Sequence, residues 1–125
     1  MEINLTNISK DFIKTYHKNE IIFKEGSIGY EMYVIVSGKI KITAHSNSKK
    51  EKLIRVLELG DFFGEMALVD SSPRSATAIS DEENTELIEI DQEKFMYLVS
   101  QQPAFALVIM EALCRRIRSL TNRIV

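Results

Sequence analysis

The hydrophobic pattern of this sequence changes its period at Asp91, and that change restricts the fold more than any other feature. From about residue 12 to residue 90, short apolar runs alternate with turn residues such as Gly26, Gly38 and Gly60. Strands broken by turns at roughly 8–12-residue spacing are typical of an all-β sandwich or barrel. After Asp91 the apolar residues recur at helical spacing. The sequence therefore predicts a mainly β fold that ends in C-terminal helices.

The β region should contain about seven or eight short strands. Polar loops at residues 44–51 and 80–84 separate some of them, whereas the first ten residues fit either a strand or a turn. The clearest runs alternate polar with β-branched residues or are continuously apolar, and they are Ile21–Phe23, Met32–Val36, Lys39–Thr43, Leu53–Leu59, Ser75–Ile79 and Glu86–Ile90.

Two helices should follow the strands. Asp91 is suited to cap the first, which we expect to run through Val99, and Pro103 fits the first turn of the second, where its missing N–H costs nothing. One apolar edge of the second helix has heptad-like spacing and contains Ala106, Met110, Leu113, Ile117, Leu120 and Ile124. The other edge contains Phe105, Val108, Ile109 and Ala112. We expect the second edge to pack on the barrel and the first to form a homodimer, with burial inside the domain as the alternative.

Length and composition favour one domain without a nucleic-acid or membrane partner. The 125 residues fit one domain over residues 1–125, with a β-barrel at about 11–90 and helices at about 91–124. A net charge of −2 gives no general attraction to nucleic acid or anionic membranes. No apolar run approaches the roughly 20 residues that span a bilayer. One cysteine and a start unlike a signal peptide favour a cytoplasmic location.

The most informative segment for chemistry runs from Phe63 to Ala78. In it Glu65 and Arg74 stand nine positions apart among apolar and small residues, with Gly64 directly before the acid. A guanidinium matches phosphate oxygens with paired charge-assisted hydrogen bonds, whereas a carboxylate accepts the proton of a hydroxyl. A helical turn that begins near Glu65 would direct backbone N–H groups at a phosphate. These groups together suit a cyclic phosphodiester on a ribose, although a structural ion pair is the alternative.

This segment resembles the phosphate-binding cassette of the cyclic-nucleotide-binding domain family, which includes the catabolite activator protein, protein kinase A regulatory subunits and nucleotide-gated channels. The family pattern is Phe-Gly-Glu, then aliphatic, small and aliphatic residues, a short loop, and Arg, a small or hydroxyl residue and Ala, and this sequence matches each position. The likeness covers roughly residues 18–124. It implies a double-stranded β-helix, or jelly-roll-like, barrel followed by a short helix and a long C-helix.

The resemblance also implies roles for the cassette residues. Glu65 would bind the ribose 2′-hydroxyl and Arg74 the cyclic phosphate, to which Ser75 would add a hydroxyl or backbone contact. Backbone N–H groups near Met66 and Ala67 would complete the cradle. Gly64 would let the backbone approach the ligand closely.

The base-contacting residues are implied by alignment through the turn glycines. Ile42 and Ile54 fall where the family lines the base, and Thr121 in the final helix is placed to hydrogen-bond the purine, in some members from the partner subunit. Ser75 leaves the choice between cAMP and cGMP open and favours cAMP.

No pattern of catalytic or metal-binding residues is present. His17 and His45 have no ligand-spaced partners, which separates the chain from metal-dependent cupin enzymes, and no nucleophile stands beside a base. We expect a non-enzymatic cyclic-nucleotide sensor, with no metal or cofactor. The alternatives are a dimerisation or interaction module of the same fold without a ligand, and the sensory half of a DNA-binding regulator whose reader lies outside this chain.

Overall fold

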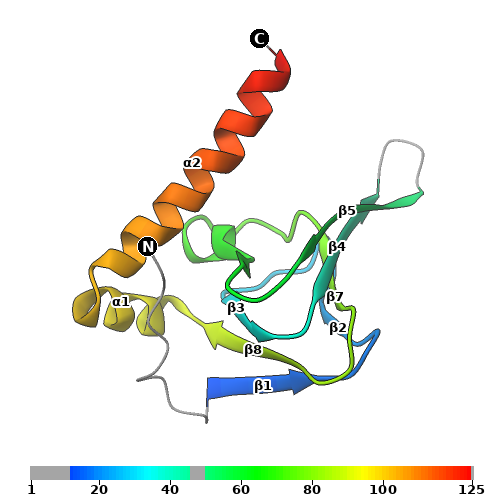
Figure 1. The fold of residues 1–125 in the computed structure, drawn as a ribbon, viewed down its shortest axis with the longest axis horizontal. Helices are drawn as coiled ribbons and strands as arrows, with labels where there is room; N and C mark the ends of the chain where they lie inside the picture. The colour runs from blue at the N-terminus through cyan, green and yellow to red at the C-terminus, as the bar shows by residue number, and fades with distance from the viewer. Residues whose placement is uncertain (1–11, 46–49, 125) are drawn as a thin grey trace. The chain divides into compact units, whose positions relative to one another are not determined.

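The computed structural model describes residues 12–45 and 50–124, with side chains as far as Ser119. Eight strands precede two helices in the described residues (Figure 1). The chain divides into a strand unit that ends at Gln92 and a helical unit that begins at Glu93. This boundary lies two residues from the predicted end of the barrel, and the assignment of residues 1–125 to one domain stays a prediction.

The strand unit consists of two four-stranded sheets in which every pair of strands is antiparallel. The first sheet has the order β1 (Ile13–Tyr16), β8 (Thr85–Ile90), β3 (Met32–Ser37) and β6 (Phe62–Phe63). The second has the order β2 (Ile21–Phe23), β7 (Thr77–Ser80), β4 (Ile40–His45) and β5 (Glu51–Leu57). Consecutive strands thus alternate between sheets at several points, as in a jelly roll. The predicted mainly β, jelly-roll-like fold with C-terminal helices is confirmed.

A hydrophobic core takes side chains from both sheets. The first sheet contributes Tyr33, Ile35, Phe63 and Leu87, and the second contributes Ile40, Leu57 and Ala78. The rings of Phe23, Tyr33 and Phe63 pack with centroids 5.3 to 6.0 Å apart. Burial raises the pKa of Tyr33 above its usual range. Because Phe23 and Phe63 lie at the ends of β2 and β6, this aromatic cluster joins the start of the loop between β2 and β3 to the start of the cassette.

The strand boundaries differ from the prediction where backbone groups pair outside the sheets. The strand predicted at Ser75–Ile79 begins only at Thr77. The backbone of Arg74 forms hydrogen bonds with Ser27 and Gly26 of a loop and not with a neighbouring strand. The strand predicted at Leu53–Leu59 ends at Leu57. There the Glu58 N–H donates to the Asp61 carboxylate at 2.9 Å and begins a turn.

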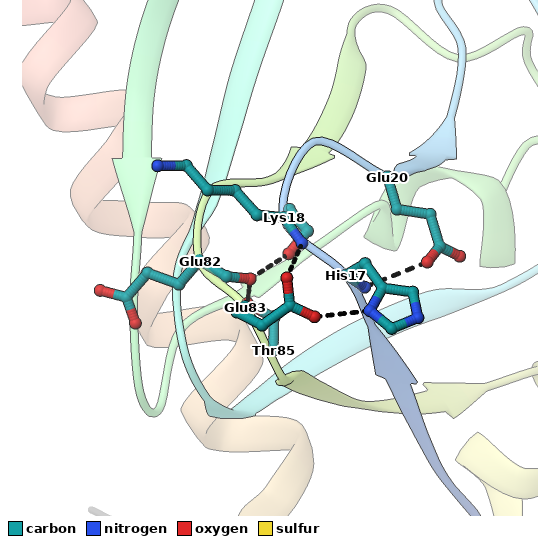
Figure 2. Close-up of polar contacts among 7 residues, drawn as sticks. His17, Lys18, Glu20, Glu82, Glu83 and Thr85 are labelled. Atoms are coloured by element: carbon teal, nitrogen blue, oxygen red, sulfur yellow. Dashed lines mark hydrogen bonds and ion pairs between the residues drawn. The ribbon is translucent and has the colours of Figure 1, made fainter.

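Two loops far apart in sequence are joined at one end of the strand unit (Figure 2). His17 Nδ1, after β1, lies 2.5 Å from Glu83 Oε1 in the loop between β7 and β8. The second oxygen of Glu83 accepts the Lys18 N–H at 3.3 Å, and Glu20 accepts the His17 N–H at 3.0 Å. The hydrogen bond and charge of Glu83 raise the pKa of His17, and the bond from His17 lowers the pKa of Glu83.

The two helices are α1 (Gln92–Gln101), whose first residue still belongs to the strand unit, and α2 (Ala104–Ile124). The first helix extends two residues beyond the predicted Val99, and the second begins directly after Pro103, as predicted. Phe95 of α1 and Phe105 of α2 pack with ring centroids 5.5 Å apart. Taken singly, neither helix in the described part of the chain is long and apolar enough to cross a bilayer, and only the pair, bent by 114°, passes a test of length and composition.

The two apolar edges of α2 differ in exposure. Phe105 and Ile109, on the edge predicted to be buried, are 3% and 7% exposed. Met110 and Ile117, on the edge predicted to meet another helix, are 58% and 61% exposed. The side chains of Leu120 and Ile124 lie outside the described residues. The exposed edge therefore keeps apolar side chains available for a partner helix.

Candidate functional site

The predicted cassette begins with a turn in the left-handed conformation that favours glycine. Gly64 follows β6 with φ of +77° and precedes a short 3-10 helix, η2 (Glu65–Leu68), so the helical turn predicted near Glu65 is confirmed. A Cβ atom at Gly64 would lie 2.8 Å from Nη1 of Arg74. The position of the Arg74 guanidinium therefore requires a residue without a Cβ atom at this turn. Glu65 occupies the first turn of η2 and is half-buried.

The guanidinium of Arg74 is enclosed by protein groups, with 4% of its side chain exposed. Nη1 donates to the carbonyl oxygen of Gly64 at 3.1 Å, and Nη2 donates to Glu31 Oε2 at 3.3 Å. Its Cζ atom lies 4.1 Å from the ring centroid of Phe23, a cation–π distance. The structure thus brings Arg74 to the residue directly before Glu65.

The loop between β2 and β3 surrounds Arg74. The Arg74 N–H donates to the carbonyl of Ser27 at 2.8 Å, and its carbonyl accepts the N–H of Gly26 at 2.7 Å. A Cβ atom at Gly29 would lie 2.3 Å from Nη2 and 2.6 Å from Nε of Arg74. Sequence reasoning missed Gly29 and Glu31. The available signal was an unexplained glycine and acid just before a buried strand.

One donor of the guanidinium is buried without a partner. Among the described residues, Nε of Arg74 has no hydrogen-bond acceptor. Buried donors of arginine are normally paired, because an unpaired one retains its desolvation cost. The Nε–H and Nη2–H groups form one fork that matches two oxygens of a single anion. The residues present therefore fit a bound phosphate at this edge of Arg74.

The other predicted cradle residues differ in their surroundings. Ser75 is exposed and follows Arg74 directly, and the side chain of Met66 is 57% exposed. The N–H of Ala67, expected to face the ligand, donates to the carbonyl of Gly64 at 3.3 Å. It is therefore directed into the 3-10 turn, because this tighter helix closes i to i+3 bonds.

The residues predicted to contact a base lie on β4, β5 and α2. Ile42 on β4 packs against the core and pairs with Arg55 on β5. The ladder between the two strands is irregular here, because Ile42 pairs with Arg55 but Thr43 pairs with Leu53, so Ile54 is the extra residue of a β-bulge. Ile54 is 56% exposed, and its contact with a base stays a prediction. Thr121 lies in α2, and its side chain is outside the described residues.

The strand register forms a row that the sequence did not predict. Phe23 pairs with Ala78, Ala78 with Ile42, and Ile42 with Arg55, so the four side chains lie on one face across β2, β7, β4 and β5. Strands about 4.8 Å apart make this row about 14 Å long. The Arg74 guanidinium lies over Phe23 at one end, and Arg55 lies at the other. Within residues 12–45 and 50–124, no three His, Cys, Asp or Glu side chains are grouped as a metal site.

Comparison with known proteins identifies relatives of this fold and cassette. The cyclic AMP receptor protein of Thermus thermophilus is 32% identical over 105 residues, which are 84% of this chain and 48% of the relative. Human cGMP-dependent protein kinase 2 is 33% identical over 84 residues, 66% of this chain and 11% of the kinase. The crystal structure of Thermus thermophilus catabolite activator protein superposes with a TM-score of 0.82 at 26% identity, and it covers 96% of this chain and 60% of that one.

The chain spans about half the length of the receptor and a ninth of the kinase. The family model described as "Cyclic nucleotide-binding domain" matches residues 13–102. This match runs from the first residue of β1 to the residue that follows α1, and it includes Gly64, Glu65 and Arg74. A match of this extent establishes that the chain belongs to the cyclic nucleotide-binding domain family.

Proposed function

We propose that this chain is a non-catalytic sensor module whose cassette binds a cyclic nucleotide, with cAMP as its ligand. The observation that carries the proposal is the environment of Arg74. A buried guanidinium that is held at the start of η2, with Nε unpaired, is suited to donate hydrogen bonds to a phosphate. A structural ion pair alone would give no reason for Nε to be buried without an acceptor.

Each cassette residue has one role in the proposed complex. Arg74 binds the cyclic phosphate, and Glu65 accepts the hydrogen bond of the ribose 2′-hydroxyl, since a carboxylate can only accept. Ser75 adds a hydroxyl contact to the phosphate. Gly64 supplies the close backbone approach, and the N–H groups of Met66 and Ala67 join the cradle after the 3-10 turn opens.

The choice of purine depends on groups at the far end of the site. Ser75 and the likeness to a protein named as a cyclic AMP receptor support cAMP. Arg55 supports cGMP as a second candidate, because it lies directly across from Ile42. Guanine presents two acceptors, O6 and N7, to a forked guanidinium, whereas adenine presents one acceptor and one donor. Thr121 of α2 is the remaining proposed base contact.

The regulatory output is proposed to pass through α2. Its exposed apolar edge, which includes Met110 and Ile117, suits a partner helix in a homodimer. A ligand shifts the arrangement of α2 only by as much as it binds one arrangement better. Sedimentation velocity with and without nucleotide tests this coupling, with Met110→Glu as the variant expected to remain a monomer.

Calorimetric titration with cAMP and cGMP tests the proposed function. We expect the wild-type chain to bind, and Arg74→Leu to lose about 2–5 kcal/mol of binding free energy, by analogy with breaking a buried charge pair. Arg115→Leu, on the exposed surface of α2, is the matched control. Arg55→Ala should weaken cGMP more than cAMP if Arg55 reads the base, and Lys41→Ala, on the opposite face of β4 from Ile42, should not. Failure of the wild type to bind either nucleotide would contradict the proposal.

A further inference from the structure

Glu31 contacts Nη2 of Arg74, the nitrogen that takes part in either paired contact of the guanidinium with an anion. A guanidinium has two forks, one formed by Nε and Nη2 and one by Nη1 and Nη2. Nη1 already donates to the Gly64 carbonyl, and Nη2 donates to Glu31 Oε2 at 3.3 Å. Because Nη2 belongs to both forks, a phosphate that binds Arg74 in this way brings its oxygens beside the Glu31 carboxylate.

The two anions oppose each other at this position. A cyclic phosphate and the Glu31 carboxylate each carry a negative charge, and like charges a few ångströms apart in a partly buried site raise each other's free energy. Glu31 lies beside a nearly enclosed guanidinium, with side chains 31% and 4% exposed respectively, so water screens the repulsion only in part. Phosphate binding therefore carries the cost of displacing or accommodating Glu31.

The geometry of Glu31 is that of a group that can leave. Its 3.3 Å contact with Arg74 is longer than the roughly 2.7–2.9 Å of a strong charge-assisted bond. The same oxygen accepts the N–H of its neighbour Tyr30 at 3.2 Å. Since 31% of the side chain is exposed, it has a route to water that does not disturb the core.

We propose that Glu31 sets the nucleotide affinity of this domain by competing with the cyclic phosphate for Nη2 of Arg74. This inference rests on the proposed binding of a cyclic nucleotide by Arg74. Glu31 holds the guanidinium over Phe23 and yields its position when the phosphate binds. Removing its charge while keeping its shape therefore strengthens binding.

The variant Glu31→Gln tests this competition, because an amide oxygen still accepts from Tyr30 and Arg74 but carries no charge. We expect calorimetry to give an affinity about three- to tenfold higher than that of the wild type. A tenfold gain corresponds to about 1.4 kcal/mol of binding free energy. The gain should be the same factor for cAMP, cGMP and 2′-deoxy-cAMP, since all three share the cyclic phosphate. A role of Glu31 in packing alone would not produce this common gain.

Glu25→Gln is the matched control. Glu25 lies in the same loop and loses the same charge, but its carboxylate pairs with His45 at 3.0 Å. The nucleotide affinity of Glu25→Gln should stay within twofold of that of the wild type. Unchanged or weaker binding by Glu31→Gln, with the wild type binding normally, overturns the competition and leaves the proposed function standing. Absence of binding by both the wild type and Glu31→Gln overturns the proposed function and the competition together.

Discussion

The carbonyl oxygen of Gly64 accepts a hydrogen bond from Nη1 of Arg74 at 3.1 Å, although the two residues are ten positions apart. This bond closes the cassette into a ring in which the arginine side chain lies against the backbone turn that begins η2. The same carbonyl accepts the N–H of Ala67. A shift of Arg74 toward a ligand is therefore coupled to the first turn of η2.

Glu65→Gln should weaken cAMP binding by about 1–3 kcal/mol, because a hydroxyl bond to a charged acceptor is replaced by a neutral one. The discrimination between cAMP and 2′-deoxy-cAMP should shrink by the same amount. Parallel titrations of the wild type and the variant with both nucleotides measure this change. An unaltered ratio of the two affinities would remove Glu65 from contact with the ribose.

Gly29→Ala should displace the Arg74 guanidinium, because the new Cβ would lie 2.3 Å from Nη2 while Phe23 and Gly64 confine the other sides. We expect nucleotide affinity to fall about tenfold or more, the equivalent of at least about 1.4 kcal/mol. The neighbouring exposed Ile28→Ala is the control and should bind as the wild type does. Equal affinities for Gly29→Ala and the wild type would show that the arginine does not need this space.

Gly38→Ala should destabilise the strand unit by two separate effects. Its φ of +88° is unfavourable for alanine, and the Cβ would lie 2.3 Å from Thr85 Oγ1 and 2.7 Å from the Thr85 Cα. Gly60→Ala has the same backbone conformation, at +89°, with nothing within 4 Å, so it measures the conformational cost alone. Chemical denaturation should give a loss of about 1–2 kcal/mol for Gly60→Ala and a clearly larger loss for Gly38→Ala. Equal losses would argue that Thr85 moves aside.

The His17–Glu83 pair should stabilise the fold only in a window of pH. Glu83 raises the pKa of His17 above 6.5, so this contribution is present below pH 6.5 and is lost as the pH rises through the raised value. His17 and the Lys18 N–H lower the pKa of Glu83 below 4.5, so its contribution is present above pH 4.5 and is lost as the pH falls through the lowered value. The pair therefore contributes most between about pH 4.5 and 6.5.

Thermal unfolding of the wild type and Glu83→Gln at pH 5.5 and pH 8.5 checks this window. The variant should unfold at a lower temperature than the wild type at pH 5.5, and the difference should shrink at pH 8.5. Glu82→Gln removes the same charge from the adjacent residue, whose carboxylate faces Lys39 at 3.6 Å. A loss for Glu83→Gln that is equal at both pH values would assign the effect to something other than the imidazolium.

The parts of the site that were predicted correctly are those encoded within a short stretch of chain. The turn at Gly64 and the helical turn at Glu65 depend on local conformation, and the arginine follows at a fixed distance in the sequence. Glu31 and Gly29 reach Arg74 from a loop more than 40 positions away, so no local pattern reports their proximity.

The register of β4 and β5 explains why Arg55 was not predicted as the neighbour of Ile42. An alignment that is correct only to within one position cannot tell whether Ile54 or Arg55 is paired with Ile42. The pairing between β4 and β5 determines this neighbour, and it depends on a bulge between Ile42 and Thr43 that the amino-acid pattern does not specify.

The pairing of β1 with β8 determines when this domain can be completed during its synthesis. Tyr16 is matched with Thr85 and Ile13 with Ile88, so this ladder of β1 forms only after the chain has been synthesised as far as β8. Closing so long a loop is slow compared with forming a hairpin. The cassette is translated before β8, which lies between β1 and β3, so the sheet that contains β6 is complete only after the cassette has been made.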